Sequence, residues 1–282
     1  MIVEILSLLT ALCYSFSSVF ILKGMRGSNP HSALLLSTSV QVALLTIFLL
    51  ADLPEVDWLA VMLFALSGIF ASGLGRLFNF IAIERLGVAT SSALGGSYPL
   101  FSTIIAIMFL REGVAILTFA GVALVVSGVF LVSGGRGEFV RGRALLIPIL
   151  SAFFYGLSDV VRKMGLNVLS ESLLGAQVGA TAGMLSFLLY LVLTGSLGEI
   201  RVSRVSFAYF SATGVIVSVG WIFTFMAMQI GTVSIVSTLT GTTPLFSVLL
   251  SWLMLRGQED LGKRVILGSM VIVTGISLVT LF

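Results

Sequence analysis

Long runs without charge constrain this chain more than any other feature. Uncharged apolar stretches of roughly 20 residues, the length needed to cross a bilayer, recur from one end of the sequence to the other. Only 10% of the residues are charged, whereas soluble domains carry about 25%. The runs are continuously apolar rather than alternating, which excludes β-barrel strands. Each run must therefore form a helix, because hydrocarbon offers its backbone groups no other partner.

Charged and turn residues divide the sequence into ten predicted transmembrane helices. Their expected bounds are 2–22, 32–51, 58–83, 88–110, 114–133, 144–163, 172–194, 206–228, 232–255 and 264–282. The first run lacks a basic segment before it and an A-x-A site after it, so we interpret it as a retained helix rather than a cleaved signal peptide. The sequence predicts an all-α integral membrane protein that crosses the cell membrane several times.

One phrase occurs twice in the sequence. Residues 94–101 read LGGSYPLF and residues 239–246 read LTGTTPLF, with Leu, Gly, Pro, Leu and Phe in register. The match extends in both directions at nearly constant offsets. Further matched pairs are Thr10 and Ser151, Tyr14 and Tyr155, Ser17 and Ser158, Gly24 and Gly165, Gly121 and Gly268, and Gly128 and Gly275. We therefore expect a five-helix unit to be present twice, in residues 1–135 and 142–282.

The odd number of helices in each unit has a geometric consequence. The second unit must enter the bilayer from the opposite side, and such inverted repeats are typical of secondary transporters, which bind solute near the midplane. In the repeated phrase, Pro99 and Pro244 each remove a helical hydrogen bond and predict a kink. Because a freed carbonyl is tolerated only beside protein or a wet cavity, both kinks are expected to face a central cavity.

The order of these motifs resembles the EamA-type drug/metabolite transporters. In both halves, small and Ser/Thr residues precede Pro-Leu-Phe, then a Leu-x-Glu turn, then Gly-x6-Gly, and the resemblance covers essentially the whole chain. It implies a ten-helix carrier of small organic solutes, with a cavity lined by helices 1, 3, 4, 6, 8 and 9. The chain departs from the pattern in two places. Ser15 stands where related four-helix multidrug exporters have a proton-coupling glutamate, and two extra residues follow Leu255.

Arg76 is the most informative single residue, because it lies deep inside the third predicted helix. An arginine near a helix centre costs about 2.5–3.5 kcal/mol on insertion scales, so it usually faces a cavity or a partner. Its guanidinium can hold a carboxylate or phosphate through paired hydrogen bonds. The structural alternatives are a side chain that reaches to the interface, or a pair with Asp159. We expect a substrate-binding role, extended by Asn79 one turn along.

Aromatic and hydroxyl side chains are expected to line the rest of the cavity. Tyr14 and Tyr155 hold matched positions in helices 1 and 6, and a buried phenol needs a partner or water. Tyr98 and Thr243 directly precede the two prolines. Trp221 holds the position in the second half that the arginine holds in the first, so it either stacks on the solute or faces lipid. The serines and threonines near the tyrosines are alternatively plain contacts between helices.

Asp159 is the candidate for coupling transport to an ion. One interpretation is an interfacial ion pair with Lys163, four residues further along the helix. The other is a carboxylate that takes up a proton in a dehydrated cavity and so couples proton flow to transport. The Ser-x3-Gly spacings at 92–96 and 237–241 are assigned to close helix packing instead.

The basic residues favour one orientation in the membrane. Eleven of them lie in the loops after odd-numbered helices, and only Arg111, Arg162 and Lys163 lie in loops on the other side. The positive-inside rule then places both termini outside, whereas EamA-type relatives generally keep both in the cytoplasm. The scattered positions of these residues also argue against a nucleic-acid surface, despite the pI of about 9.3.

These features favour a secondary carrier that moves a small zwitterionic or anionic metabolite, such as an amino acid, by alternating access. The sequence has no GxxxxGK[ST] loop for ATP, and it lacks both HExxH and the carboxylate pair of an intramembrane protease. A channel would need a continuous pore. The alternative substrate class is an amphipathic or cationic drug. The expected partners are the solute and the bilayer, with no metal, cofactor or nucleic acid, and the monomer is expected to be functional.

Overall fold

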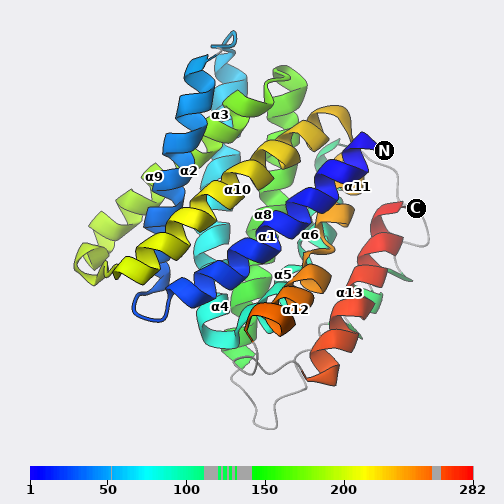
Figure 1. The fold of residues 1–282 in the computed structure, drawn as a ribbon. Helices are drawn as coiled ribbons and strands as arrows, with labels where there is room; N and C mark the ends of the chain where they lie inside the picture. Colours follow the sequence, from blue (N-terminus) through cyan, green and yellow to red (C-terminus); the bar gives the residue numbers. More distant parts are fainter. Residues whose placement is uncertain are drawn as a thin grey trace.

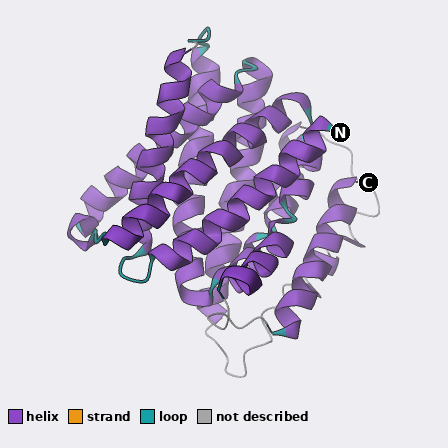
Figure 2. Cartoon of the chain, in the orientation of Figure 1, coloured by secondary structure: helices purple, strands orange, loops and turns teal. Residues whose placement is uncertain are grey.

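The computed structural model describes residues 1–51, 53–110, 142–255 and 262–281, with further residues between 120 and 131. Helices make up almost all of these ranges, which contain no strand (Figure 2). Eight helical segments within them are long and apolar enough to cross a membrane. The predicted fold class, an all-α integral membrane protein, is thereby confirmed.

The described helices lie within about five residues of the predicted spans at each end, the largest difference being at the end of α8. The first half contains α1 (Ile2–Gly24), α2 (Pro30–Ala51), α3 (Trp58–Gly68), the π-helix η1 (Ile69–Gly75), α4 (Arg76–Leu86), α5 (Val88–Gly95) and α6 (Tyr98–Leu110). The second contains α8 (Gly142–Val168), α9 (Ser172–Thr194), the 3-10 helix η2 (Ser196–Glu199), α10 (Arg204–Ile230), α11 (Val233–Thr240), α12 (Thr243–Met254) and α13 (Lys263–Leu281). The predicted helix 114–133 lies largely outside the described residues, so the count of ten stays a prediction.

The two halves interlock rather than form separate bodies. α1 and α10 lie side by side, with α2 and α9 beside them and α13 at the opposite edge (Figure 1). Behind them, α8 packs against α3 and α6. Most of these pairs join a helix of the first half to one of the second. The halves therefore share their buried interior, and residues from both can meet in one site.

The third predicted helix is not α-helical throughout. Seven residues of η1 form a π-helix that ends directly before Arg76. The junction of α3 and η1 packs closely on α9, because a Cβ added to Gly68, the last residue of α3, would lie 1.9 Å from the carbonyl oxygen of Gly179. A Cβ added to Gly183 would lie 2.3 Å from Cβ of Ser72. π-helical turns occur frequently at functional sites, and this one ends directly before the buried arginine.

The Gly68 contact gives a prediction about stability. Gly68→Val is expected to lower the free energy of unfolding by about 1–3 kcal/mol or more, because the added atoms collide with backbone atoms that cannot rotate away. Gly198→Val is the matched control, because no atom lies within 4 Å of a Cβ added there. Thermal unfolding of the two purified variants in detergent measures the difference. Equal melting temperatures would contradict the close packing of α3 on α9.

The two proline phrases break their helices rather than kink them. α5 and α6 are separated at Gly96–Ser97, and α11 and α12 at Gly241–Thr242. Pro99 and Pro244 each stand second in the new helix, where the missing N–H leaves no hydrogen bond unmade. The predicted kinks are therefore corrected to short turns. Both turns begin with the same backbone angles, φ −60° and ψ −9°.

The two breaks lie against each other. A Cβ added to Gly96 would lie 2.4 Å from Cγ of Pro244, and one added to Gly241 would lie 2.7 Å from Cγ of Pro99. Each half thus provides a proline that packs on the glycine of the other, which explains why both turns need glycine. The close contact expected at Gly96 and Gly241 is confirmed.

The Gly-x6-Gly pairs meet in the same reciprocal way. A Cβ added to Gly128 would lie 2.9 Å from the carbonyl oxygen of Gly268. One added to Gly275 would lie 2.7 Å from the carbonyl oxygen of Gly121. Contacts that repeat with the halves exchanged support the duplication proposed from the sequence.

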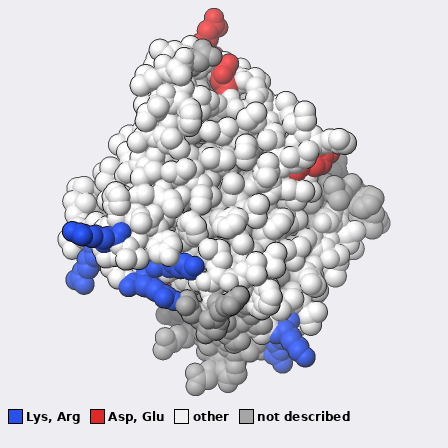
Figure 3. Space-filling view, in the orientation of Figure 1, with Lys and Arg blue, Asp and Glu red and all other residues white. Residues whose placement is uncertain are grey.

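Charged side chains gather at the two ends of the molecule. Figure 3 shows Lys and Arg at the lower end of this view and Asp and Glu at the upper end. Arg162 and Lys163, counted above as loop residues of the acidic end, lie inside α8, which continues to Val168. Their assignment to a loop is therefore wrong, and the orientation with both termini outside stays a prediction.

Candidate functional site

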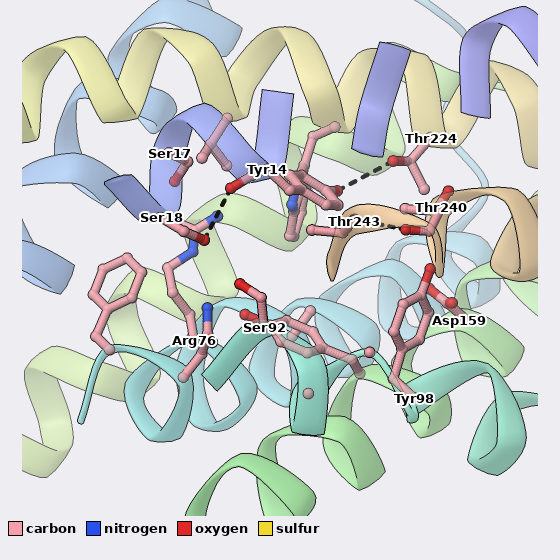
Figure 4. Close-up of a pocket in the computed structure, with 18 of the residues that line it drawn as sticks. Tyr14, Ser17, Ser18, Arg76, Ser92, Tyr98, Asp159, Thr224, Thr240 and Thr243 are labelled. Carbon is pink, nitrogen blue, oxygen red and sulfur yellow. Dashed lines mark hydrogen bonds between the residues drawn. The ribbon is translucent and has the colours of Figure 1, made fainter. Parts of the chain in front are cut away.

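A cavity of about 120 Å³ lies between the two halves (Figure 4). Its lining comes from α1, η1, α4, α5, α6, α8, α10, α11 and α12, which correspond to predicted helices 1, 3, 4, 6, 8 and 9. All the candidate binding and coupling residues line it: Tyr14, Arg76, Asn79, Tyr98, Tyr155, Asp159, Trp221 and Thr243. Pro99 and Pro244 are not among its described lining residues, although the adjacent Tyr98 and Thr243 are. The structure thus brings together residues that are up to 229 positions apart in the sequence, Tyr14 and Thr243 being the extremes.

Arg76 is buried, and two residues of α2 accept hydrogen bonds from its guanidinium. Its Nη1 donates to Oγ1 of Thr38 at 3.0 Å and to Oε1 of Gln41 at 2.8 Å. The side chain therefore neither reaches to the interface nor pairs with Asp159; Figure 4 shows the two towards opposite ends of the cavity. Both partners of the guanidinium are neutral. Among the described residues Nη2 and Nε of Arg76 have no partner, so these donors can bind an acidic group.

Asp159 pairs with an arginine and not with the predicted lysine. Its carboxylate accepts a hydrogen bond from Nη1 of Arg162 at 2.9 Å, and both side chains are buried. Lys163 instead donates to the carbonyl oxygens of Met228 and Gly231, at 2.8 and 3.0 Å. These carbonyls lie at the end of α10, where a helix leaves its last acceptors unpaired. The expected pair with Lys163 is wrong because the end of α10 provides these alternative acceptors.

Arg162 is the main site residue that the sequence analysis missed. Its Cζ lies 5.3 Å from the ring centroid of Trp221 and 4.7 Å from that of Phe225. Cζ of Arg76 lies 5.8 Å from the same Trp221 ring. One buried indole therefore contacts two guanidinium groups, an arrangement stabilised by cation–π attraction. Trp221 is only 4% exposed, so the lipid-facing alternative is wrong.

The two predicted tyrosines occupy equivalent places. A Cβ added to Gly220 would lie 3.1 Å from the ring of Tyr14, and one added to Gly75 would lie 3.1 Å from the ring of Tyr155. These glycines directly precede Trp221 and the cavity arginine. The hydroxyl of Tyr14 is hydrogen-bonded to the hydroxyl of Thr224, at 3.1 Å (Figure 4). The tyrosine rings therefore hold matched places, one against the residue before Trp221 and the other against the residue before Arg76.

Tyr98 and Thr243 line the cavity beside the helix breaks. The hydroxyl of Tyr98 donates to the carbonyl oxygen of Ser237, at 3.1 Å, and so links the two breaks. The hydroxyl of Thr243 donates to the carbonyl oxygen of Thr240, at 2.6 Å. The backbone of Thr243 in turn accepts a hydrogen bond from Ser15, at 3.0 Å. Ser15 therefore provides a hydrogen-bond donor for a backbone carbonyl next to the break.

Several small polar residues also line the cavity without having been predicted to do so. They are Ser92, Thr224 and Thr240. Ser92 was assigned to helix packing, and its position four residues before the break at Gly96 would have been a signal for the cavity. Thr240 lies within the repeated phrase itself, and Thr224 lies one turn after Trp221. Spacing from residues already identified as candidates could therefore have found all three.

One family model matches the chain twice. It describes the EamA-like transporter family, and the matched segments are residues 1–134 and 142–281. The chain belongs to the EamA-like transporter family. It is accordingly a membrane transporter that crosses the bilayer several times. The two matched segments also have nearly the bounds expected of the five-helix units, whose duplication stays a proposal.

Two other comparisons find proteins that are similar to this EamA-like transporter over nearly its whole length. An uncharacterized transporter of Archaeoglobus fulgidus is 21% identical over 279 residues, which are 98% of this chain and 97% of the relative. A solved structure, described only as the crystal structure of a protein, has a TM-score of 0.70 at 18% identity and covers 99% of this chain and 96% of that one. Identity this low shows the fold alone. The architecture of this EamA-like transporter thus recurs in a distant protein.

Proposed function

We propose that this EamA-like transporter carries a small carboxylated metabolite, either zwitterionic like an amino acid or anionic, across the cell membrane by alternating access. The observation that carries the proposal is the buried guanidinium of Arg76, which faces the cavity with neutral partners behind it. In this arrangement Nη2 and Nε bind the acidic group of the solute. Two parallel hydrogen bonds from arginine to a carboxylate give both binding energy and orientation.

The charges around the cavity favour an acidic solute. Among the described lining residues, the charged ones are Arg76, Arg162 and Asp159. Asp159 compensates Arg162, so one positive charge is left over. A buried charge without a counter-charge is costly, and an entering carboxylate offsets that cost. Binding is therefore expected to be strongest for solutes that bring one negative group.

The two broken helices support alternating access. Each break separates a helix into two short segments that meet the break of the other half beside the cavity. A rearrangement at either break changes one wall of the cavity, as the inverted-repeat mechanism requires. Helices from both halves of the chain line the cavity, so we propose that one copy is sufficient for transport.

Coupling to protons is proposed to depend on Asp159. A proton on this carboxylate removes the charge that compensates Arg162 and so raises the positive charge of the cavity by one unit. Uptake of an anion and uptake of a proton would then favour each other. The alternative is that the pair with Arg162 only holds α8 in place against α10.

Export of amphipathic cations is the second candidate function. Five aromatic side chains line the cavity, those of Tyr14, Phe80, Tyr98, Tyr155 and Trp221, and such walls bind quaternary ammonium groups. The surplus positive charge disfavours this candidate, because it repels a cation. The two candidates therefore predict opposite charge preferences.

Counterflow in proteoliposomes tests the proposal. Vesicles with purified protein are loaded with one unlabelled compound and receive the same compound in labelled form outside, using the proteinogenic amino acids, lactate, succinate and choline. We expect accelerated, saturable exchange of at least one carboxylated compound and none of choline. Exchange of choline alone would instead establish the cation exporter. Flux that does not respond to the unlabelled compound inside would indicate a channel.

A further inference from the structure

Of the two arginines that contact Trp221, one has a negatively charged partner and the other has only neutral hydrogen-bond partners. Arg162 is paired with the carboxylate of Asp159, which cancels its charge. Arg76 is bound by a hydroxyl and by the side-chain amide of Gln41, both neutral. Two buried guanidinium groups beside one indole thus differ in the charge of the residue that holds them. This difference decides which of the two is available to an anion.

Gln41 acts from outside the cavity. It lies on α2, which contributes no residue to the described lining, and its side chain is completely buried. Its Oε1 accepts from Nη1 of Arg76 at 2.8 Å. Nη1 is hydrogen-bonded to Thr38 and Gln41 of α2. The other edge of the guanidinium, which includes Nη2, is therefore free to face the cavity. The position of the amide thereby fixes the orientation of the planar group.

The amide of Gln41 is a costly choice if stability is its only role. Its Nε2 is buried with no hydrogen-bond partner among the described residues. A donor left unpaired in this way costs about 1–3 kcal/mol. A glutamate of almost the same shape would remove the orphaned donor and form a stronger, charge-assisted bond to the arginine. That substitution, however, would also neutralise the guanidinium.

We propose that Gln41 is a positioning residue that orients the guanidinium of Arg76 while leaving its charge uncompensated, and that it thereby sets the preference of the cavity for acidic solutes. The inference rests on the proposed function, in which Arg76 holds the acidic group. In this scheme an amide at position 41 is required because it accepts a hydrogen bond without carrying a negative charge. Thr38 provides the second neutral acceptor in the same way.

The test compares two variants of similar size, Gln41→Glu and Gln41→Met. Gln41→Glu is expected to keep or raise the melting temperature, yet to raise KM for the best carboxylated compound of the counterflow panel by about 10- to 100-fold, the range of a lost charge-assisted bond. Discrimination against choline should fall together with it. Gln41→Met keeps the charge of Arg76, so its KM should rise less than that of the glutamate variant.

The outcomes separate this inference from the proposed function. A wild-type KM in Gln41→Glu overturns the inference alone, provided that Arg76→Ala still abolishes exchange. Exchange that survives Arg76→Ala overturns the proposed function and the inference with it. A lower melting temperature in Gln41→Glu, or an equal rise of KM in both variants, shows a merely structural role for Gln41. A stable Gln41→Glu protein with a selectively raised KM supports the inference.

Discussion

Replacing Arg76 by alanine is expected to abolish exchange of carboxylated solutes while the protein still folds and inserts into the membrane. The change removes the one charge in the cavity that no described neighbour compensates. It also removes the donors that face the solute, so we expect a loss of about 100-fold or more in kcat/KM, the size of a lost charge-assisted pair. Initial rates of counterflow measure the loss, and the amount of protein recovered in the vesicles measures insertion.

Two further variants make the Arg76 result specific. Arg76→Lys keeps the charge but not the planar pair of donors, so its activity should lie between those of wild type and the alanine variant. Arg204→Gln removes an arginine from the exposed start of α10 and should exchange solute normally. Unaltered kinetics in Arg76→Ala would rule out a role for this residue in binding.

Removing Asp159 alone is expected to destabilise the protein strongly. Asp159→Ala leaves Arg162 buried with no counter-charge, and breaking a buried ion pair in this way costs about 3–5 kcal/mol. Thermal unfolding in detergent should therefore show a markedly lower melting temperature for this variant. The loss comes from the charge left behind and not from the missing carboxylate itself.

The double variant Asp159→Ala/Arg162→Met separates these two causes. Removing both charges should recover most of the stability that the single change loses, because no buried charge is then left unpaired. The difference between the double variant and the two single variants gives the coupling energy of the pair. Purely additive losses would contradict a coupled pair.

The sequence predicted the residues of the cavity better than it predicted their partners. Arg76 and Asp159 could be identified because charged side chains in long apolar runs are costly and therefore informative. The contacts that hold Arg76 could not be identified, since α2 is 35 residues away and a lone amide such as Gln41 does not reveal which helix it will face. Periodicity describes one helix at a time, whereas a partner depends on which helices pack together.

The predicted helix ends were wrong where charged side chains find partners inside the protein. The adjacent Arg162 and Lys163 suggested the end of a membrane helix, but α8 continues to Val168. A carboxylate one turn earlier and the terminal carbonyls of α10 pair with these two cations. The π-helix before Arg76 was missed for a related reason, because no local sequence pattern marks it, while its neighbourhood on α9 depends on glycine contacts between distant helices.

Pro99 packs on Gly241 and Pro244 packs on Gly96, so the sequence of each half restricts which residues the other half can have at these positions. A larger residue at either glycine would collide with a rigid ring from the opposite copy, so these positions can change only as matched pairs. The proposed solute site is under no such restriction, and there the two halves differ, with an arginine in one and Trp221 in the other. In the duplication that we propose, the two halves have therefore stayed alike where they pack on each other. They have diverged in the cavity, where binding one kind of solute requires different side chains from each half.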